Sequence, residues 1–309
     1  MFKKVTLIFA VFLTAVVFVY AKDIQRKPQI ITTLFPTYDF AKQIGRDKID
    51  ITLLLPPGVE PHTFEPKPQD IVKINKSDIF IYTGKDMEPW AEDLLKAIPN
   101  KNLKVVDASS GIEFISGKEE HDEENNHDHH HTEKDPHIWL DFENAMIMVD
   151  TIAKALIEKD PANKDFYLKN ATEYKDKLAD LDNRVKETLA GAKHKTIIYG
   201  GHFTFGYFAK RYGLEYDSPY EGFSPNAQPS PKAIGELIKK LKKSQIKYIY
   251  YEELLDPKVA RTISQATGAK LELLHGAHNV SKTELKSGIT FIDIMNDNLK
   301  KLKEGLECR

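Results

Sequence analysis

Short apolar runs alternate with amphipathic stretches along the first half of the chain. Four runs rich in Ile, Leu, Val, Phe and Tyr have the length of buried strands, and the segments between them are predicted to be helices. The expected strands are residues 30–34, 49–55, 79–82 and 104–107, and the expected helices are residues 37–44, 69–75 and 90–98. Strands that alternate with helices predict an α/β lobe with a mostly parallel sheet.

A second series of the same kind begins at residue 196. Its expected strands are residues 196–199, 246–251 and 270–274, and its expected helices are residues 203–212, 232–243 and 257–267. The two halves also share a weak pattern, because PQDIVKINKSDIFIYTG and SPKAIGELIKKLKKSQIKYIYYE each combine a proline, an amphipathic helix, a polar break and an aromatic-aliphatic strand. Such patterns are common to βα units, but they are also what two similar α/β lobes would show.

Between the two series, apolar residues recur at three- and four-residue steps from residue 161 to residue 190. This stripe predicts one long helix, which at about 1.5 Å per residue would extend on the order of 40 Å. Such a helix resists sharp bending and would join the lobes rigidly. The alternative is the seam of a coiled-coil dimer, although the pattern at most barely reaches the four heptads that make such an interpretation firm.

The N-terminus has the features of an export signal. Lys3 and Lys4 precede an apolar run at residues 5–20, and Ala21 follows it. A cleaved signal peptide is the first interpretation, and an uncleaved membrane anchor is the alternative, although the run is short for a membrane span. No cysteine follows the run to hold a lipid anchor, because the single cysteine is Cys308. A lone cysteine also excludes an intrachain disulfide and a zinc site built on several thiolates.

The predicted organisation therefore has four parts. They are a signal peptide at residues 1–21, a first lobe at 22–160 with a His-rich acidic loop at 117–134, a linking helix at 161–190 and a second lobe at 191–309. The formal net charge of −2 argues against a general nucleic-acid binder, which would have a basic surplus. A periplasmic protein is expected.

Histidines supply the candidate chemistry. Imidazole binds borderline metals such as zinc while it is still neutral near pH 7. The tract EEHDEENNHDHHH, which begins at residue 119, is predicted to be a solvated loop, and it is either a weak collector of metal ions or simply an acidic loop. His194, in the polar sequence AKHK, is predicted to lie on the surface.

The remaining histidines stand beside predicted strands or at the edge of an apolar run: His62, His137, His202, His275 and His278. Ligands of open α/β sheets bind outside the carboxyl ends of the strands. Any one of these histidines taken alone could be structural, but several placed alike favour a common cleft between the lobes.

Five segments in order resemble the metal-specific substrate-binding proteins of bacterial ABC transporters, of the zinc/manganese class. They are LFPTYDFAKQIG, LLPPGVEPHTFEPKPQDI, DPHIWLD after an acidic His-rich insertion, GGHFTFGYFAKRYGL and TFIDIMNDNLKKLKEGL. The resemblance covers nearly the whole chain after residue 21. It implies two α/β lobes joined by a rigid helix, with one metal ion between them.

The motif match implies that His62 and His137 are ligands from the first lobe and that His202 is a ligand from the second. Manganese-type members tend to have Glu at the third position and zinc-type members His, which agrees with the preference of Zn²⁺ for imidazole and of Mn²⁺ for oxygen. The fourth ligand of the family is commonly an Asp after the last strand, but residues 270–280 contain none. His275 is the first candidate there, His278 the second, and water the third.

The expected function is therefore capture of Zn²⁺ and its delivery to the membrane permease of an ABC transporter, by a monomer that is not an enzyme. Manganese or another divalent metal is an alternative cargo. A zinc hydrolase would need a base such as Glu60, Glu65 or Glu252, but neither H-E-x-x-H nor a nucleophile elbow is present. A metal-buffering or adhesion protein that works through the His-rich tract is the third possibility.

Overall fold

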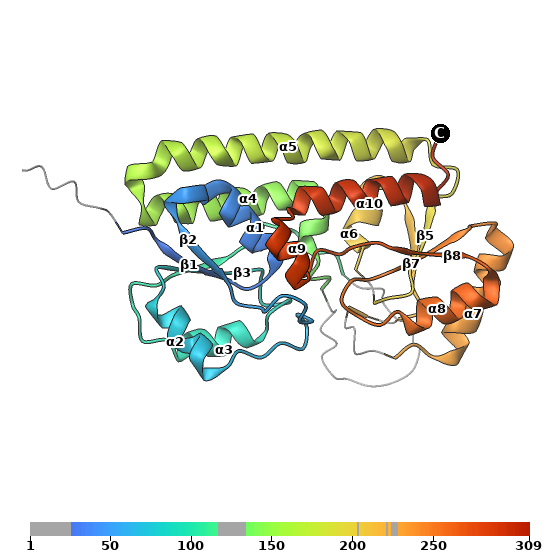
Figure 1. The fold of residues 1–309 in the computed structure, drawn as a ribbon, viewed down its shortest axis with the longest axis horizontal. Helices are drawn as coiled ribbons and strands as arrows, with labels where there is room; N and C mark the ends of the chain where they lie inside the picture. Colours follow the sequence, from blue (N-terminus) through green and yellow to red (C-terminus); the bar gives the residue numbers. More distant parts are fainter. Residues whose placement is uncertain (1–25, 117–133, 203, 221, 224–227) are drawn as a thin grey trace, which may run out of the picture.

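The computed structural model describes residues 26–116, 134–202, 204–220, 222–223 and 228–309. Two α/β lobes lie side by side, and long helices run across both of them (Figure 1). The predicted signal peptide and residues 117–133 of the predicted His-rich loop lie outside the described residues. No helix within the described ranges combines the length and the apolar character needed to cross a membrane.

The first lobe has a parallel sheet with the strand order β2-β1-β3-β4. Its strands are β1 (Gln29–Thr32), β2 (Asp50–Leu53), β3 (Ile79–Tyr82) and β4 (Lys104–Asp107). Its helices are α1 (Phe35–Gly45), α2 (Pro68–Lys76) and α3 (Trp90–Lys96). Along β3, Ile79 and Ile81 pack into the main core, whereas Phe80 and Tyr82 pack into the cluster beneath α2 and α3. A strand covered on both faces is apolar throughout, which explains why β3 was predicted correctly.

The second lobe repeats this topology. Its strands are β5 (Thr196–Ile198), β6 (Glu215–Asp217), β7 (Tyr248–Tyr251) and β8 (Lys270–Leu273), and its helices are α6 (Gly206–Tyr212), α7 (Pro231–Ser244) and α8 (Lys258–Thr267). The pairs β5-β6 and β7-β8 are parallel, and a parallel bridge between Tyr199 and Tyr250 joins them. The resulting order, β6-β5-β7-β8, corresponds to that of the first lobe. The predicted similarity of the two halves therefore has a structural counterpart.

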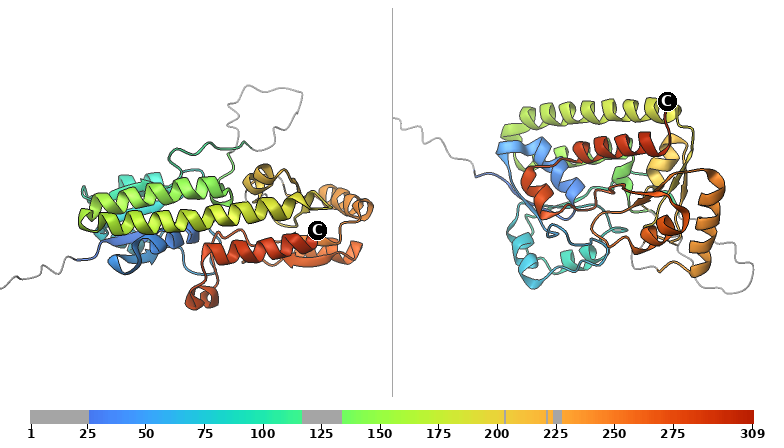
Figure 2. Two further views of the ribbon diagram at one scale, coloured as in Figure 1. Left: turned by 90° about the horizontal axis from the view of Figure 1, so that it is seen from above. Right: turned by 45° about the vertical axis from the view of Figure 1, so that its right-hand side comes forward.

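The predicted long helix is confirmed as α5 (Lys164–Ala190), which extends over both lobes (Figure 2). A short 3-10 turn (Pro161–Asn163) precedes it and joins it to α4 (Phe142–Lys159), a helix that was not predicted from the sequence. Tyr174 and Leu178 of the apolar stripe are buried in the core of the chain itself. The coiled-coil alternative would need a second chain to cover this stripe, but the core of the chain itself already covers it.

The C-terminal segment returns to the first lobe before it ends in the second. After α9 (Lys282–Ser287), helix α10 (Phe291–Gly305) begins with the Phe291 ring 5.2 Å from that of Phe40 in α1. It ends beside β7, where Tyr248 donates to Glu304. The predicted division at residue 191 remains a prediction, but the start of α10 packs against the first lobe.

Candidate metal centre

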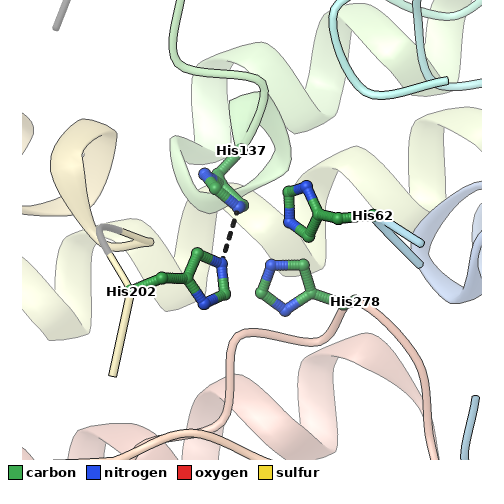
Figure 3. A group of neighbouring side chains, drawn as sticks. All are labelled: His62, His137, His202 and His278. Carbon is green, nitrogen blue, oxygen red and sulfur yellow. Dashed lines mark hydrogen bonds between the residues drawn. The ribbon is translucent and has the colours of Figure 1, made fainter. Parts of the chain in front are cut away.

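Four imidazoles from distant parts of the sequence meet at the junction of the lobes (Figure 3). His62 lies in the loop after β2, and His137 precedes the 3-10 turn Ile138–Leu140. His202 follows β5, and His278 follows β8. Each side chain offers one ligand atom, and these four atoms lie within 4.8 Å of one another. The carboxyl ends of strands from both lobes thus contribute to one site, as expected for open α/β sheets.

The geometry of this group suits a tetrahedral metal ion. The ring centroids of all six pairs are separated by 4.9–5.7 Å. The Nε2 atoms of His137 and His202 are 3.4 Å apart. Zinc–nitrogen bonds of about 2.0–2.1 Å in a tetrahedron place neighbouring nitrogens roughly 3.3–3.4 Å apart. The Nε2 atoms of His62 and His278 are buried without a hydrogen-bond partner, which is costly unless a cation binds them.

Carboxylates hold two of these imidazoles in one tautomer. Asp135 Oδ1 accepts from the backbone N–H of His137 at 2.9 Å and from its Nδ1 at 2.7 Å. Glu253 Oε1 accepts in the same way from the backbone N–H of His278 at 3.1 Å and from its Nδ1 at 2.9 Å. Because each Nδ1 keeps its proton, each Nε2 keeps its lone pair for a metal ion.

The other two imidazoles are held differently. Glu252 Oε2 lies against Nδ1 of His202, so this imidazole also has a carboxylate partner. His62 is fixed through its backbone, whose N–H donates to Glu60 Oε1 at 3.0 Å. His62 is only partly buried, whereas His137, His202 and His278 are buried. Three imidazoles thus form an enclosed set, and the fourth comes from a more exposed loop.

Burial lowers the pKa of two of these imidazoles. Burial, together with the neighbouring His278 and His202, lowers the pKa of His62 to about 2. Burial and the adjacent histidines also hold the pKa of His137 well below its usual range. Burial opposes protonation of His278 as well, but the charge and the hydrogen bond of Glu253 outweigh it and raise the pKa of His278.

His275, the first candidate for the fourth ligand, is not a member of this group, and its place is taken by the second candidate, His278. His275 is buried, but its Nδ1 accepts from the backbone N–H of Ala277 at 2.9 Å, and its own backbone N–H donates to Asn298 of α10 at 2.9 Å. Ala277 adopts a positive φ of 60°, and His278 follows this turn. Residue spacing gives no signal for such a turn at an alanine, because left-handed backbone is uncommon outside glycine.

The other residues considered from the sequence are placed as follows. Glu65 is exposed, and Glu60 accepts from the backbone N–H groups of His62 and Thr63. His194 lies near the C-terminus, with its Nε2 3.9 Å from Glu307. None of these three residues belongs to the group of imidazoles that the described residues form.

Two parallel-sheet lobes, a long helix across them and a cluster of imidazoles at their junction that could hold a metal ion are typical of the metal-specific substrate-binding proteins. The family model described as the periplasmic component A of the zinc-uptake complex, ZnuA, matches residues 30–305, so the chain belongs to this family. The predicted fold class and the predicted resemblance are therefore confirmed.

Individual relatives have zinc in their names. The chain is 41% identical over 282 residues to the high-affinity zinc uptake system protein ZnuA of Bacillus subtilis (strain 168), which covers 91% of this chain and 88% of that protein. It is 37% identical over 287 residues to the zinc-binding lipoprotein AdcA of Streptococcus pneumoniae. This alignment covers 92% of this chain and 56% of AdcA, so the chain spans about half the length of AdcA. The solved Zn(II)-bound ZnuA-like domain of AdcA superposes with a TM-score of 0.77 at 33% identity, over 91% of this chain and 100% of that domain.

Proposed function

We propose that this chain is the substrate-binding component of an ABC importer, which captures Zn²⁺ between its lobes and delivers it to a membrane permease. The observation that supports this most directly is the group of four imidazoles whose ligand atoms lie within 4.8 Å of one another. The ligands proposed are His62, His137, His202 and His278. Membership of the zinc-uptake family and the zinc named in its relatives support the same cargo.

The donor set favours zinc over manganese. Imidazole nitrogen suits Zn²⁺, whereas Mn²⁺ prefers carboxylate, carbonyl and water oxygens in a larger shell. The carboxylates of Asp135, Glu252 and Glu253 contact the outer nitrogens of the imidazoles rather than the centre of the group. They add negative charge around a divalent ion without offering it the oxygen ligands that manganese needs.

The same geometry supports a carrier rather than a hydrolase. A catalytic zinc keeps one coordination position for water, whereas four protein ligands fill a tetrahedral shell. Glu252, a candidate general base, already lies against Nδ1 of His202. We further propose that the protein is exported by a cleaved signal peptide at residues 1–21, acts in the periplasm and works as a monomer.

Competition titration against a chromophoric zinc chelator tests the proposed function. We expect tight binding of one Zn²⁺ per chain, weak competition by Mn²⁺, and a large loss of affinity in His62→Ala and His202→Ala. His194→Ala is the matched control, because His194 lies outside the group, and it should bind zinc as the wild type does. Unchanged affinity in the first two variants would refute the interlobe site. Loss of tight binding on deletion of residues 119–134 would instead favour the metal-buffering alternative.

A further inference from the structure

The loop after β8, residues 275–280, is hydrogen-bonded to the first lobe on more than one side. Trp139, two residues after His137, donates its indole N–H to the carbonyl of Gly276 at 2.8 Å. Near the other end of the loop, the backbone N–H of Gly58 donates to the carbonyl of Val280 at 2.9 Å. The loop that contains His278 thus joins the segments that contain two other ligands.

Asn279 makes the most specific of these connections. Its side chain is fully buried, and its Nδ2 donates to the carbonyl of Pro56 at 2.8 Å and to the carbonyl of Val59 at 2.9 Å. A carboxamide nitrogen has two hydrogens, so both donors are used. Its Oδ1 accepts from the backbone N–H of Val280. A single side chain thereby holds two points of the loop that leads to His62.

From Pro56 to Val59 that loop has few other means of fixing its course, whereas beyond this stretch Pro61 is buried and the Phe64 ring lies 5.9 Å from that of Trp90. Pro56 is exposed, Gly58 has a φ of 85°, and Val59 is 37% exposed, so apolar packing does little to hold this stretch. Glu60 shapes the next turn by accepting from the backbone N–H of His62, but this contact lies within the loop itself. Packing within the first lobe fixes only the far side of His62, so the position of His62 relative to His278 depends on contacts that reach across to the loop after β8.

We infer that Asn279 is a positioning residue for zinc binding. Its carboxamide joins the loop that contains His62 to the loop that contains His278, and this sets the position of His62. This inference rests on the proposed function. The metal ion joins His62 and His278, and the Asn279 carboxamide joins the loops of the same two residues. A ligand held in place before binding loses less conformational freedom when the ion arrives, and this raises affinity and slows dissociation.

Substitution of Asn279 should therefore weaken zinc binding without removing a ligand. We expect Asn279→Ala to lower zinc affinity by about tenfold, which corresponds to about 1.4 kcal/mol, and to do so mainly through faster dissociation. Asn279→Asp keeps the size of the side chain but places an oxygen where an N–H donor faced a carbonyl. It should show the same loss, and it serves as the test if the alanine variant does not fold.

A double-mutant cycle separates this role from a general loss of structure. If Asn279 acts through His62, Asn279→Ala should have almost no further effect on zinc affinity in a His62→Ala background. The matched control is Asn170→Ala, because Asn170 is also buried and donates to a backbone carbonyl, that of Ile44, at 2.9 Å between α5 and α1. It should lower the melting temperature and leave zinc affinity unchanged.

The outcomes distinguish the two proposals. A loss of affinity in the wild-type background that vanishes in the His62→Ala background supports the positioning role. Wild-type affinity in the Asn279 variants, or an equal loss in both backgrounds, overturns this role and leaves the proposed function intact. Absence of tight zinc binding in the wild type, or no effect of His62→Ala, overturns the proposed function and the inference with it.

Discussion

Replacement of Asp135 by Asn isolates what a single charge contributes to the metal centre. Asp135 and His137 are both fully buried, and Oδ1 of Asp135 accepts from the backbone N–H and from Nδ1 of His137. An asparagine carboxamide has nearly the same shape, so its oxygen can occupy the position of Oδ1 and accept both hydrogen bonds. The variant therefore keeps the geometry and removes the negative charge.

The expected loss of zinc affinity in Asp135→Asn follows from the strength of these hydrogen bonds. Hydrogen bonds to a charged partner contribute about 1.5–3 kcal/mol, and neutral ones contribute about 0.5–1.5 kcal/mol. The difference of about 1–1.5 kcal/mol corresponds to a loss of zinc affinity of about tenfold, because His137 becomes a weaker electron donor. Asp135→Ala also removes the hydrogen-bond acceptor. Removal of the hydrogen-bond partner of a metal ligand lowers metal affinity by about 10- to 100-fold, and the loss of zinc affinity in this variant should lie near the upper end of that range.

Zinc affinity of both variants can be measured by competition with a chelator, and their folding by thermal melting without metal. Asp39→Asn is the matched control, because Asp39 is also buried and accepts at 3.0 Å from the hydroxyl of Tyr174 and from the backbone N–H of Phe291. These contacts join α1 to α5 and α10, so this variant should melt earlier but bind zinc normally. Wild-type affinity in Asp135→Ala, or an equal loss in Asp39→Asn, would refute the reasoning.

Two further predictions concern the histidines. Removal of the hydrogen-bond partner of a metal ligand lowers metal affinity by about 10- to 100-fold. His278→Gln should lower zinc affinity by more than this, whereas the zinc affinity of His275→Gln should stay within a few-fold of the wild type. The reverse order in a zinc titration would show that His275 is the ligand. The metal-free protein should also become less stable as the pH falls below about 6.5. The unfolded chain then binds protons at His62 and His137 that the folded chain does not bind, because folding lowers the pKa of His62 to about 2 and holds that of His137 well below its usual range. His278, whose pKa is raised, stabilises the fold fully below about 6.5 and loses this contribution only at higher pH. Urea unfolding of the metal-free protein at pH 7 and pH 5 measures this loss of stability, which should be smaller in His62→Ala. Equal unfolding midpoints at the two pH values would contradict the prediction.

The apolar and amphipathic pattern was sufficient for most of the fold. Strands such as β3 and β4 have the predicted bounds because they are short apolar runs bordered by polar residues. The strand β6 (Glu215–Asp217) was missed because it is three residues long and its single buried residue, Tyr216, gives no periodic signal. The start of α10 could not be placed from its sequence either, since its amphipathic pattern does not show which lobe covers its apolar face.

The sequence by itself determined the chemistry of this protein: neutral imidazoles at the edges of predicted strands, and an α/β chain that repeats its own topology. The family resemblance implied His62, His137 and His202 as ligands, and the structure brings these three imidazoles together. The resemblance did not decide between His275 and His278, because both lie in one loop. The tertiary structure brings His278 rather than His275 into the group of imidazoles, since the positive φ of Ala277 and the bonds of the loop to α10 and to the first lobe set the direction of each side chain. Contacts between segments far apart in the chain determine such directions, and local spacing contains no information about them.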